Sequence, residues 1–224
     1  MSGHRAAGAS PTKLASWIGP SRTAVLIVDM QVDFASPTGA VGLTGADLGD
    51  VPAALAAASR VAKAAREAGV RVVFVHLETR EETDSAAWAK RIRRRGGLPA
   101  KALALCRAGT PGADFCGPRP AQGDLAIAKT RYSAFFGTDL NGRLKALGID
   151  TLVVCGLTTD CCVDCTVRDA FHLDYHVLLA ADACAAYDSR LHGAALQSLE
   201  TNFAILAAAD DVIAAWGLSK RMHR

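Results

Sequence analysis

Short, nearly continuous apolar runs alternate along the chain with longer segments in which apolar residues recur at helical spacing. The short runs are rich in Val, Ile, Leu and Ala. Continuous runs of this length are typical of strands that helices cover on both faces. We predict six strands, at residues 23–29, 71–78, 124–129, 151–156, 176–182 and 203–209.

The segments between the runs favour helices. Residues 48–69 are rich in Ala, carry Lys and Arg towards their end and finish on a glycine, which favours a helix with a glycine stop. Residues 138–148 place leucines at helical spacing before another glycine, and residues 191–202 and 209–217 have a similar pattern.

Strands that alternate with helices predict an α/β fold of Rossmann-like type: a single-domain, three-layer αβα arrangement around a six-stranded, mostly parallel open sheet. We expect the domain at residues 21–218, between an N-terminal arm (1–20) and a C-terminal tail (219–224). Residues 96–123 are rich in Gly, Pro and Ala and too long for a simple connection. We expect them to fold over the site or to contact a neighbouring subunit.

Composition and charge exclude several classes of protein. The net charge is +3 over 224 residues, and the one basic cluster, at residues 90–97, lacks interleaved aromatic residues, so we expect no nucleic-acid partner. No apolar run approaches the about 20 residues of a membrane span, and the N-terminus lacks a secretory apolar region. Seven cysteines without framework spacing fit a reducing compartment, so we expect a cytoplasmic protein.

Four cysteines cluster around the end of the fourth predicted strand: position 155 lies in the strand, and positions 161, 162 and 165 follow it. A structural zinc site would require a second ligand pair, which does not follow. A redox pair of Cys162 and Cys165 lacks thioredoxin-like surroundings. A nucleophile in the first turn of a helix is the third interpretation, because backbone N–H groups there lower a thiol pKa and can bind an oxyanion. By position, Cys161 and Cys162 both qualify.

Two further reactive side chains end predicted strands: Asp29 ends the first and Lys129 the third. The carboxyl ends of parallel strands meet at one edge of a sheet, where ligands bind. A carboxylate there can take the proton of a thiol, and an ammonium group can hold that carboxylate in place. His76, in the second strand, is better explained as a core or rim histidine.

Three stretches resemble one known family: "AVLIVDMQVDF" (24–34), "KTRYSAFFGTDL" (129–140) and "VVCGLTTDCCVDCTVRDAF" (153–171). In this order they are similar to the isochorismatase-like cysteine hydrolases. That family includes nicotinamidases and the N-carbamoylsarcosine, biuret and ureidoacrylate amidohydrolases. The resemblance implies the isochorismatase-like hydrolase fold, and a homo-oligomer (dimer or tetramer).

The resemblance also implies a catalytic triad of Asp29, Lys129 and Cys162. Cys162 is preferred to Cys161 because it fills the family pattern Gly-x-x-Thr-x-x-Cys. The family further implies a cis peptide bond between Leu157 and Thr158, with the N–H groups of Thr158 and Cys162 as the oxyanion hole.

Residues within the matching stretches are expected to bind the substrate: Gln31, Phe34, Arg131, Tyr132 and Phe135. One of the arginines at positions 91, 93 and 94 could bind a substrate carboxylate, although a solvated role is the simpler interpretation.

We expect no metal and no cofactor. Nicotinamidases of this family hold a metal with an Asp-x-His motif and further histidines after the second strand. Here that region offers only His76 and Glu78, and two ligands make a poor site.

The expected activity is that of a cysteine-dependent amidohydrolase that cleaves a C–N bond of a small amide or ureido (carbamoyl) compound through a thioester. Three alternatives stay open: an isochorismatase-type vinyl-ether hydrolase, a nicotinamidase-like amidase, and a redox-sensing protein on the same scaffold.

Overall fold

The structure is a computed structural model that describes residues 10–222, with the backbone alone for residues 218–222. Residues 1–9 of the predicted arm and residues 223–224 of the predicted tail lie outside the described residues. No helix within the described range is long and apolar enough to cross a membrane.

The predicted α/β fold is confirmed, and every strand pairing is parallel. The strand order is β3-β2-β1-β4-β5-β6, so the direction of winding reverses between β1 and β4. Ligands of such sheets bind outside the carboxyl ends of the strands at this switch point. The strands are β1 (Thr23–Val28), β2 (Arg71–Leu77), β3 (Leu125–Lys129), β4 (Thr151–Leu157), β5 (His176–Ala185) and β6 (Ile205–Ala207).

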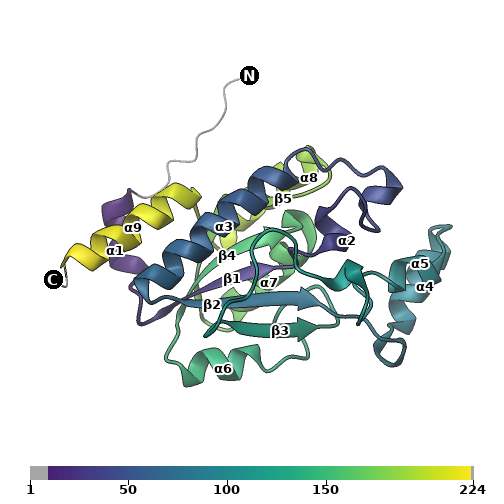
Figure 1. Cartoon of the computed structure of the whole chain (residues 1–224), viewed down its shortest axis with the longest axis horizontal. Helices are drawn as coiled ribbons and strands as arrows, with labels where there is room; N and C mark the ends of the chain where they lie inside the picture. The colour runs from purple at the N-terminus through teal and green to yellow at the C-terminus, as the bar shows by residue number, and fades with distance from the viewer. Residues whose placement is uncertain (1–9, 223–224) are drawn as a thin grey trace.

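Helices cover both faces of the sheet (Figure 1). On one face, α3 packs against α9 and several central strands, and α1 packs against α9. On the other face lie α6 and α7, and α8 packs against α7 and β6. The helices are α1 (Pro11–Trp17), α2 (Val32–Ala35), α3 (Val51–Ala68), α4 (Ala86–Arg94), α5 (Pro99–Leu103), α6 (Leu140–Ala146), α7 (Asp164–His172), α8 (Ser189–Asn202) and α9 (Ala209–Met222).

Two strands, β5 and β6, differ from the prediction by more than one residue at an end. β5 continues past Asp182, which interrupts the apolar run; the Asp182 carboxylate accepts a hydrogen bond from the Ala209 amide at 2.7 Å. β6 is shorter than predicted, because Phe203 caps the end of α8 and α9 already begins at Ala209.

Part of the predicted N-terminal arm is packed into the core. Leu14 and Ile18 are fully buried, and the indole N–H of Trp216 on α9 donates a hydrogen bond to the Ile18 carbonyl at 3.0 Å. Pro11 at the start of α1 and the Ser10 side chain, which accepts from the Lys13 amide, favour a helix start here. The sequence pattern did not predict α1, because a helix of seven residues contains too few apolar positions for a helical period to be recognised.

The long irregular stretch contains α5 and a short 3-10 helix (Pro111–Ala113). Figure 1 shows α4 and α5 beyond the carboxyl ends of β2 and β3. The Phe115 backbone forms a bridge with Gln31, so the stretch returns to the end of β1. These segments therefore surround the edge of the sheet where Asp29 and Lys129 lie.

Candidate active site

Asp29 and Lys129 form a buried ion pair across three strands. Asp29 follows β1 with a positive φ of 50°, and Lys129 ends β3, with β2 between them. Because neighbouring strands lie about 4.8 Å apart, only a long side chain can span β2. The Lys129 Nζ donates to Asp29 Oδ2 at 2.7 Å and to the Arg131 carbonyl at 3.0 Å, and both residues are 1% exposed.

The second oxygen of the Asp29 carboxylate has no partner. Oδ1 is buried and accepts no hydrogen bond within residues 10–222. Buried polar atoms are nearly always hydrogen-bonded, so an exception of this kind requires an explanation, of which a catalytic role is one. Lys129 therefore holds one oxygen of Asp29 while the other remains available to accept a proton.

The two central residues of the cysteine cluster, Cys161 and Cys162, lie in a turn that differs from the predicted α-helix start. The Leu157–Thr158 peptide bond is cis. A π-helical turn, η4 (Thr159–Val163), follows it, and α7 begins only at Asp164. Cys162 therefore lies in η4, rather than in the first turn of an α-helix, and is 8% exposed.

The charges around Cys162 favour a protonated thiol in the resting site. A hydrogen bond with Cys161, burial and the Asp29 carboxylate raise the pKa of Cys162, against the opposing effect of Lys129. Burial alone would lower the pKa of Lys129, but Asp29 and Cys162 together raise it. A thiol that keeps its proton needs an acceptor before it can attack, and Asp29 lies close enough to influence it.

A cavity of about 640 Å³ opens onto Asp29 and Cys162. Lys129 lies behind Asp29 and does not line it. Of the residues predicted to bind substrate or to form the oxyanion hole, the cavity brings together Phe34, Arg131, Tyr132, Leu157, Thr158 and Cys162.

Two residues predicted to bind substrate lie elsewhere. The side-chain amide of Gln31 hydrogen-bonds to backbone groups. Its Nε2 donates to the carbonyls of Leu77 and Ala113, and its Oε1 accepts from the Leu77 amide. Phe135 stacks on Tyr175 with ring centroids 5.8 Å apart. Neither lines the cavity. Gln31 instead ties the end of β1 to β2, because its side chain replaces missing backbone partners.

The cavity also contains aromatic residues that the sequence patterns did not identify. Trp88 on α4 packs edge-to-face on Tyr132, with ring centroids 5.9 Å apart. The Tyr187 hydroxyl donates to the Phe34 carbonyl at 2.8 Å. Arg91 lines the cavity, whereas Arg93 and Arg94 do not. Trp88 and Arg91 are three residues apart on α4, so they lie on the same face of the helix. Because Arg91 was already a candidate for binding substrate, this spacing could have indicated Trp88 as well.

The described residues do not fit a bound metal ion. Within residues 10–222 no group of three or more His, Cys, Asp or Glu is arranged to hold one. Glu78 pairs with Arg80 at 2.7 Å, and His76 packs on Phe115 with centroids 5.3 Å apart. Burial lowers the pKa of His76 despite the nearby carboxylates of Glu78 and Asp29.

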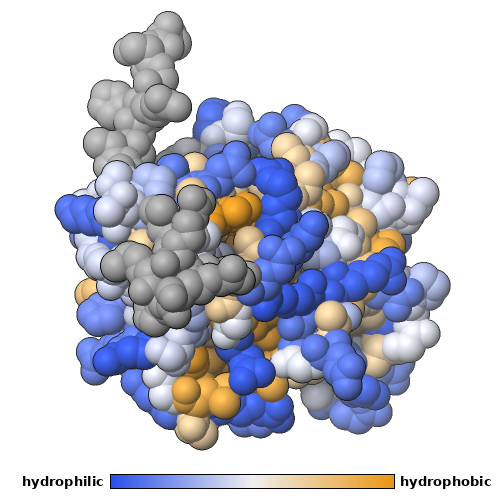
Figure 2. Space-filling view, turned by 60° about the vertical axis from the view of Figure 1, so that its left-hand side comes forward, coloured by the Kyte–Doolittle hydropathy of each residue, from blue (hydrophilic) through white to orange (hydrophobic). Residues whose placement is uncertain are grey.

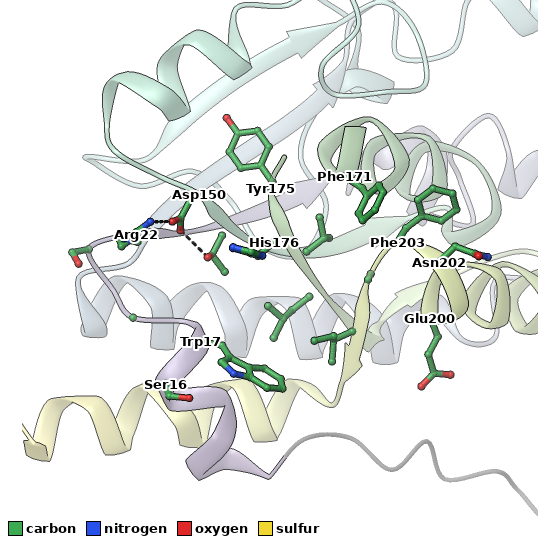
Figure 3. Close-up of a pocket in the computed structure, with 17 residues that line it drawn as sticks. Ser16, Trp17, Arg22, Asp150, Phe171, Tyr175, His176, Glu200, Asn202 and Phe203 are labelled. Carbon is green, nitrogen blue, oxygen red and sulfur yellow. Dashed lines mark hydrogen bonds and ion pairs between the residues drawn. The ribbon is translucent and has the colours of Figure 1, made fainter. Parts of the chain in front are cut away.

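A different cavity, of about 750 Å³, lies at the opposite edge of the sheet (Figure 3). It is lined by Trp17, Phe171, His176 and the ion pair of Arg22 and Asp150. Figure 2 brings the α1 and α9 side of the molecule forward, and hydrophobic side chains form separate patches on that mostly hydrophilic face. Because this cavity contains none of the predicted site residues, the one with Asp29 and Cys162 is the candidate active site.

Residues 23–211 match the family model described as the Isochorismatase domain. The chain is 34% identical over 198 residues to the ureidoacrylate amidohydrolase RutB of Azorhizobium caulinodans, covering 83% of this chain and 86% of the relative. It is 35% identical over 210 residues to the RutB of Variovorax paradoxus, with 86% and 81% covered.

Solved structures agree with the sequence comparison. A cysteine hydrolase from Pseudomonas syringae pv. phaseolicola superimposes with a TM-score of 0.79 at 27% identity, covering 90% of this chain and 95% of that one. N-carbamoylsarcosine amidase from Thermoplasma acidophilum gives a TM-score of 0.66 at 28% identity, covering 84% and 97%.

Proposed function

The chain belongs to the isochorismatase family, and on that premise we propose that it is an amidohydrolase using Asp29, Lys129 and Cys162 as its catalytic triad. It hydrolyses a C–N bond of a small ureido or amide compound. One observation carries the assignment of roles: Asp29 has one carboxylate oxygen held by Lys129 and one buried oxygen without a partner. It lies beside the Cys162 thiol, whose pKa is raised by the hydrogen bond with Cys161 and by burial.

The first step acylates the enzyme. Asp29 takes the proton of Cys162 as the sulfur attacks the substrate carbonyl, and a tetrahedral oxyanion forms. The proton then passes from Asp29 to the nitrogen of the breaking C–N bond. The amine or ammonia leaves, and the acyl or carbamoyl group remains on Cys162 as a thioester.

The second step releases the acyl group. Asp29, again ionised, takes a proton from a water molecule that attacks the thioester. The acid or carbamate departs, and the proton returns to the Cys162 sulfur. One water is consumed in each cycle.

Two groups stabilise the charges that develop. Lys129 fixes the orientation of Asp29 and lies beside the sulfur as negative charge forms on it. The Thr158 N–H donates to no acceptor within residues 10–222. It is therefore available, with the Cys162 N–H, as an oxyanion hole.

The cavity favours a ureido substrate that also carries a carboxylate. Arg91 and Arg131 line it, and neither forms an ion pair with an acidic side chain in the described part of the chain. A guanidinium group suits a carboxylate through two parallel hydrogen bonds. The most similar relatives named here are ureidoacrylate amidohydrolases, which agrees with that charge pattern.

The test is a panel of small substrates assayed with and without chelator, for ammonia or amine release from the nitrogen compounds and for the alcohol and carbonyl products of a vinyl ether. It compares ureido acids, their uncharged amides, nicotinamide and a vinyl ether. We expect the ureido acids to give the highest kcat/KM, and chelator to change nothing. Turnover of the vinyl ether alone would favour the isochorismatase-type alternative, and chelator-sensitive turnover of nicotinamide would favour the nicotinamidase-like one.

We also propose that the protein works in the cytoplasm as a homo-oligomer. The seven cysteines are all free, which suits a reducing compartment. Leu98, between α4 and α5, is 65% exposed, and a neighbouring subunit would cover it. Light scattering of the purified protein gives the subunit number.

A further inference from the structure

We propose that His192 on α8 is a positioning residue that holds the nucleophile turn η4 in its reactive geometry through Thr159. This inference rests on the proposed function, because it concerns how Cys162 is presented to the substrate. His192 does not itself line the cavity and hydrogen-bonds to Thr159, so its effect passes through the turn.

The contact joins two elements that are distant in the sequence. The Thr159 hydroxyl and His192 Nδ1 are 2.8 Å apart. Thr159 is fully buried at the first position of η4, and His192 lies partly buried in the first turn of α8. This contact fixes the start of the turn against a helix that is itself capped by Asp188.

The direction of the hydrogen bond follows from the lack of another acceptor for the Thr159 hydroxyl. Its hydroxyl makes no other hydrogen bond within residues 10–222. A buried O–H without an acceptor is costly, so Thr159 must donate and His192 Nδ1 must accept. That requires the neutral imidazole with its proton on Nε2.

Neutral His192 is also what its surroundings favour near pH 7. Burial is the largest effect and lowers the pKa of His192. The carboxylates of Asp50, at the start of α3, and of Asp160, in η4, raise it by less. Protonation of Nδ1 would turn the acceptor into a donor and leave the Thr159 O–H unpaired.

Thr159 is well placed to control the thiol. It stands between the Leu157–Thr158 peptide bond and Cys162, and the amide of Val163 donates to the Thr158 carbonyl at 3.1 Å. A shift of Thr159 therefore moves the oxyanion-hole amides and the sulfur together. Displacements of about 1 Å in an active site can reduce turnover by about 100-fold.

The experiment compares kcat, KM, thermal stability and the pH profile of five proteins on the best substrate of the panel. They are wild type, His192→Ala, His192→Asn, Leu191→Ala and Cys162→Ala. Asn carries its oxygen at the same distance along the side chain as His Nδ1, so it can accept from Thr159 without titrating. Leu191 is the exposed neighbour on α8 and serves as the matched control.

We expect His192→Ala to lower kcat by about 10- to 100-fold with little change in KM, because the turn and not the substrate site is disturbed. His192→Asn should recover most of that loss. Wild type should lose activity as His192 becomes protonated, at a pH below the ordinary histidine pKa of 6.5, whereas His192→Asn should keep its activity there. Leu191→Ala should behave as wild type.

Wild-type kcat in His192→Ala would overturn the inference. So would a slow His192→Ala that His192→Asn does not rescue, with an unmoved pH profile, since packing alone would then explain the loss. Activity in Cys162→Ala would instead overturn the proposed function, whatever the His192 variants do.

Discussion

At the scale of single residues, the proposed mechanism depends on one carboxylate whose two oxygens have different surroundings. Lys129 donates a hydrogen bond to Asp29 Oδ2, and Asp29 Oδ1 is buried without a hydrogen-bond partner within residues 10–222. The sequence indicated both residues, because each ends an apolar run. It could not indicate which oxygen stays free, since that depends on how Lys129 reaches across β2.

Asp29→Asn should abolish most of the activity and destabilise the protein. The amide cannot take a thiol proton, so kcat should fall by about 10²- to 10⁴-fold. Lys129 would remain buried without its counter-charge, which should cost about 3–5 kcal/mol of unfolding free energy. Urea denaturation and steady-state kinetics measure both.

Asp174→Asn is the matched control for Asp29→Asn, because Asp174 also has a positive φ, of 64°, but does not line the cavity. It should leave kcat and stability close to wild type. Equal losses in the two variants would contradict the assigned role of Asp29.

The buried thiols should be inert in the folded protein. Burial raises the pKa of Cys155 well above its ordinary value and that of Cys184 to about 12, so both stay protonated at pH 8. Iodoacetamide at pH 8 should therefore label the partly exposed Cys116 and Cys161 before Cys155 and Cys184. Mass spectrometry of the labelled peptides measures this, and labelling of Cys155 at the rate of Cys116 would be the contrary result.

At the scale of elements, periodicity predicted the strands well and the turns poorly. The starts of β1, β2 and β4 agree with the prediction, because continuous apolar runs begin there. Tyr187 was missed because it follows the true end of β5, which lies beyond the polar Asp182. The π-helical turn was also missed, because its geometry follows from packing against α7, α8 and β4 and not from residue preferences.

Gly156 in β4 should tolerate no side chain. Its φ is +135°, and an added Cβ would lie 2.1 Å from the Val28 carbonyl oxygen in β1. Gly156→Ala should lower the free energy of unfolding by about 3 kcal/mol or more. Gly142→Ala in α6 is the control: nothing lies near its Cβ, and it should stabilise by about 0.5–1 kcal/mol. Chemical denaturation of both variants checks this, and equal stabilities would refute the close approach of β1 and β4.

At the scale of the whole molecule, a short helix of the predicted N-terminal arm, α1, packs onto the core. The family model begins at residue 23, yet Leu14 in α1 and Ile18 at its end are fully buried, and α1 packs against α9. Their two apolar positions are too few to distinguish a short packed helix from an arm. The fold class was predictable because apolar runs alternate with helical segments along the chain, and Asp29 and Lys129 were candidates because they stand at the ends of such runs.

Leu14→Ala tests whether α1 belongs to the folded domain. Removing a fully buried leucine side chain should cost about 2–5 kcal/mol. Thr12→Ala, on the exposed side of α1, should change the stability by less than about 0.5 kcal/mol. Thermal unfolding of both variants provides the comparison, and a Leu14→Ala protein as stable as wild type would show that α1 adds nothing to the core.

The most direct test of the central claim is the turnover rate of Cys162→Ala beside that of Cys161→Ala, on the substrate that wild type hydrolyses fastest. The two thiols are adjacent and both line the cavity, so general disturbance of the site should be similar. We predict that Cys162→Ala has no measurable amidohydrolase activity and that Cys161→Ala keeps a substantial part of it. Loss of activity in Cys161→Ala alone, or activity that survives in Cys162→Ala, would contradict the account.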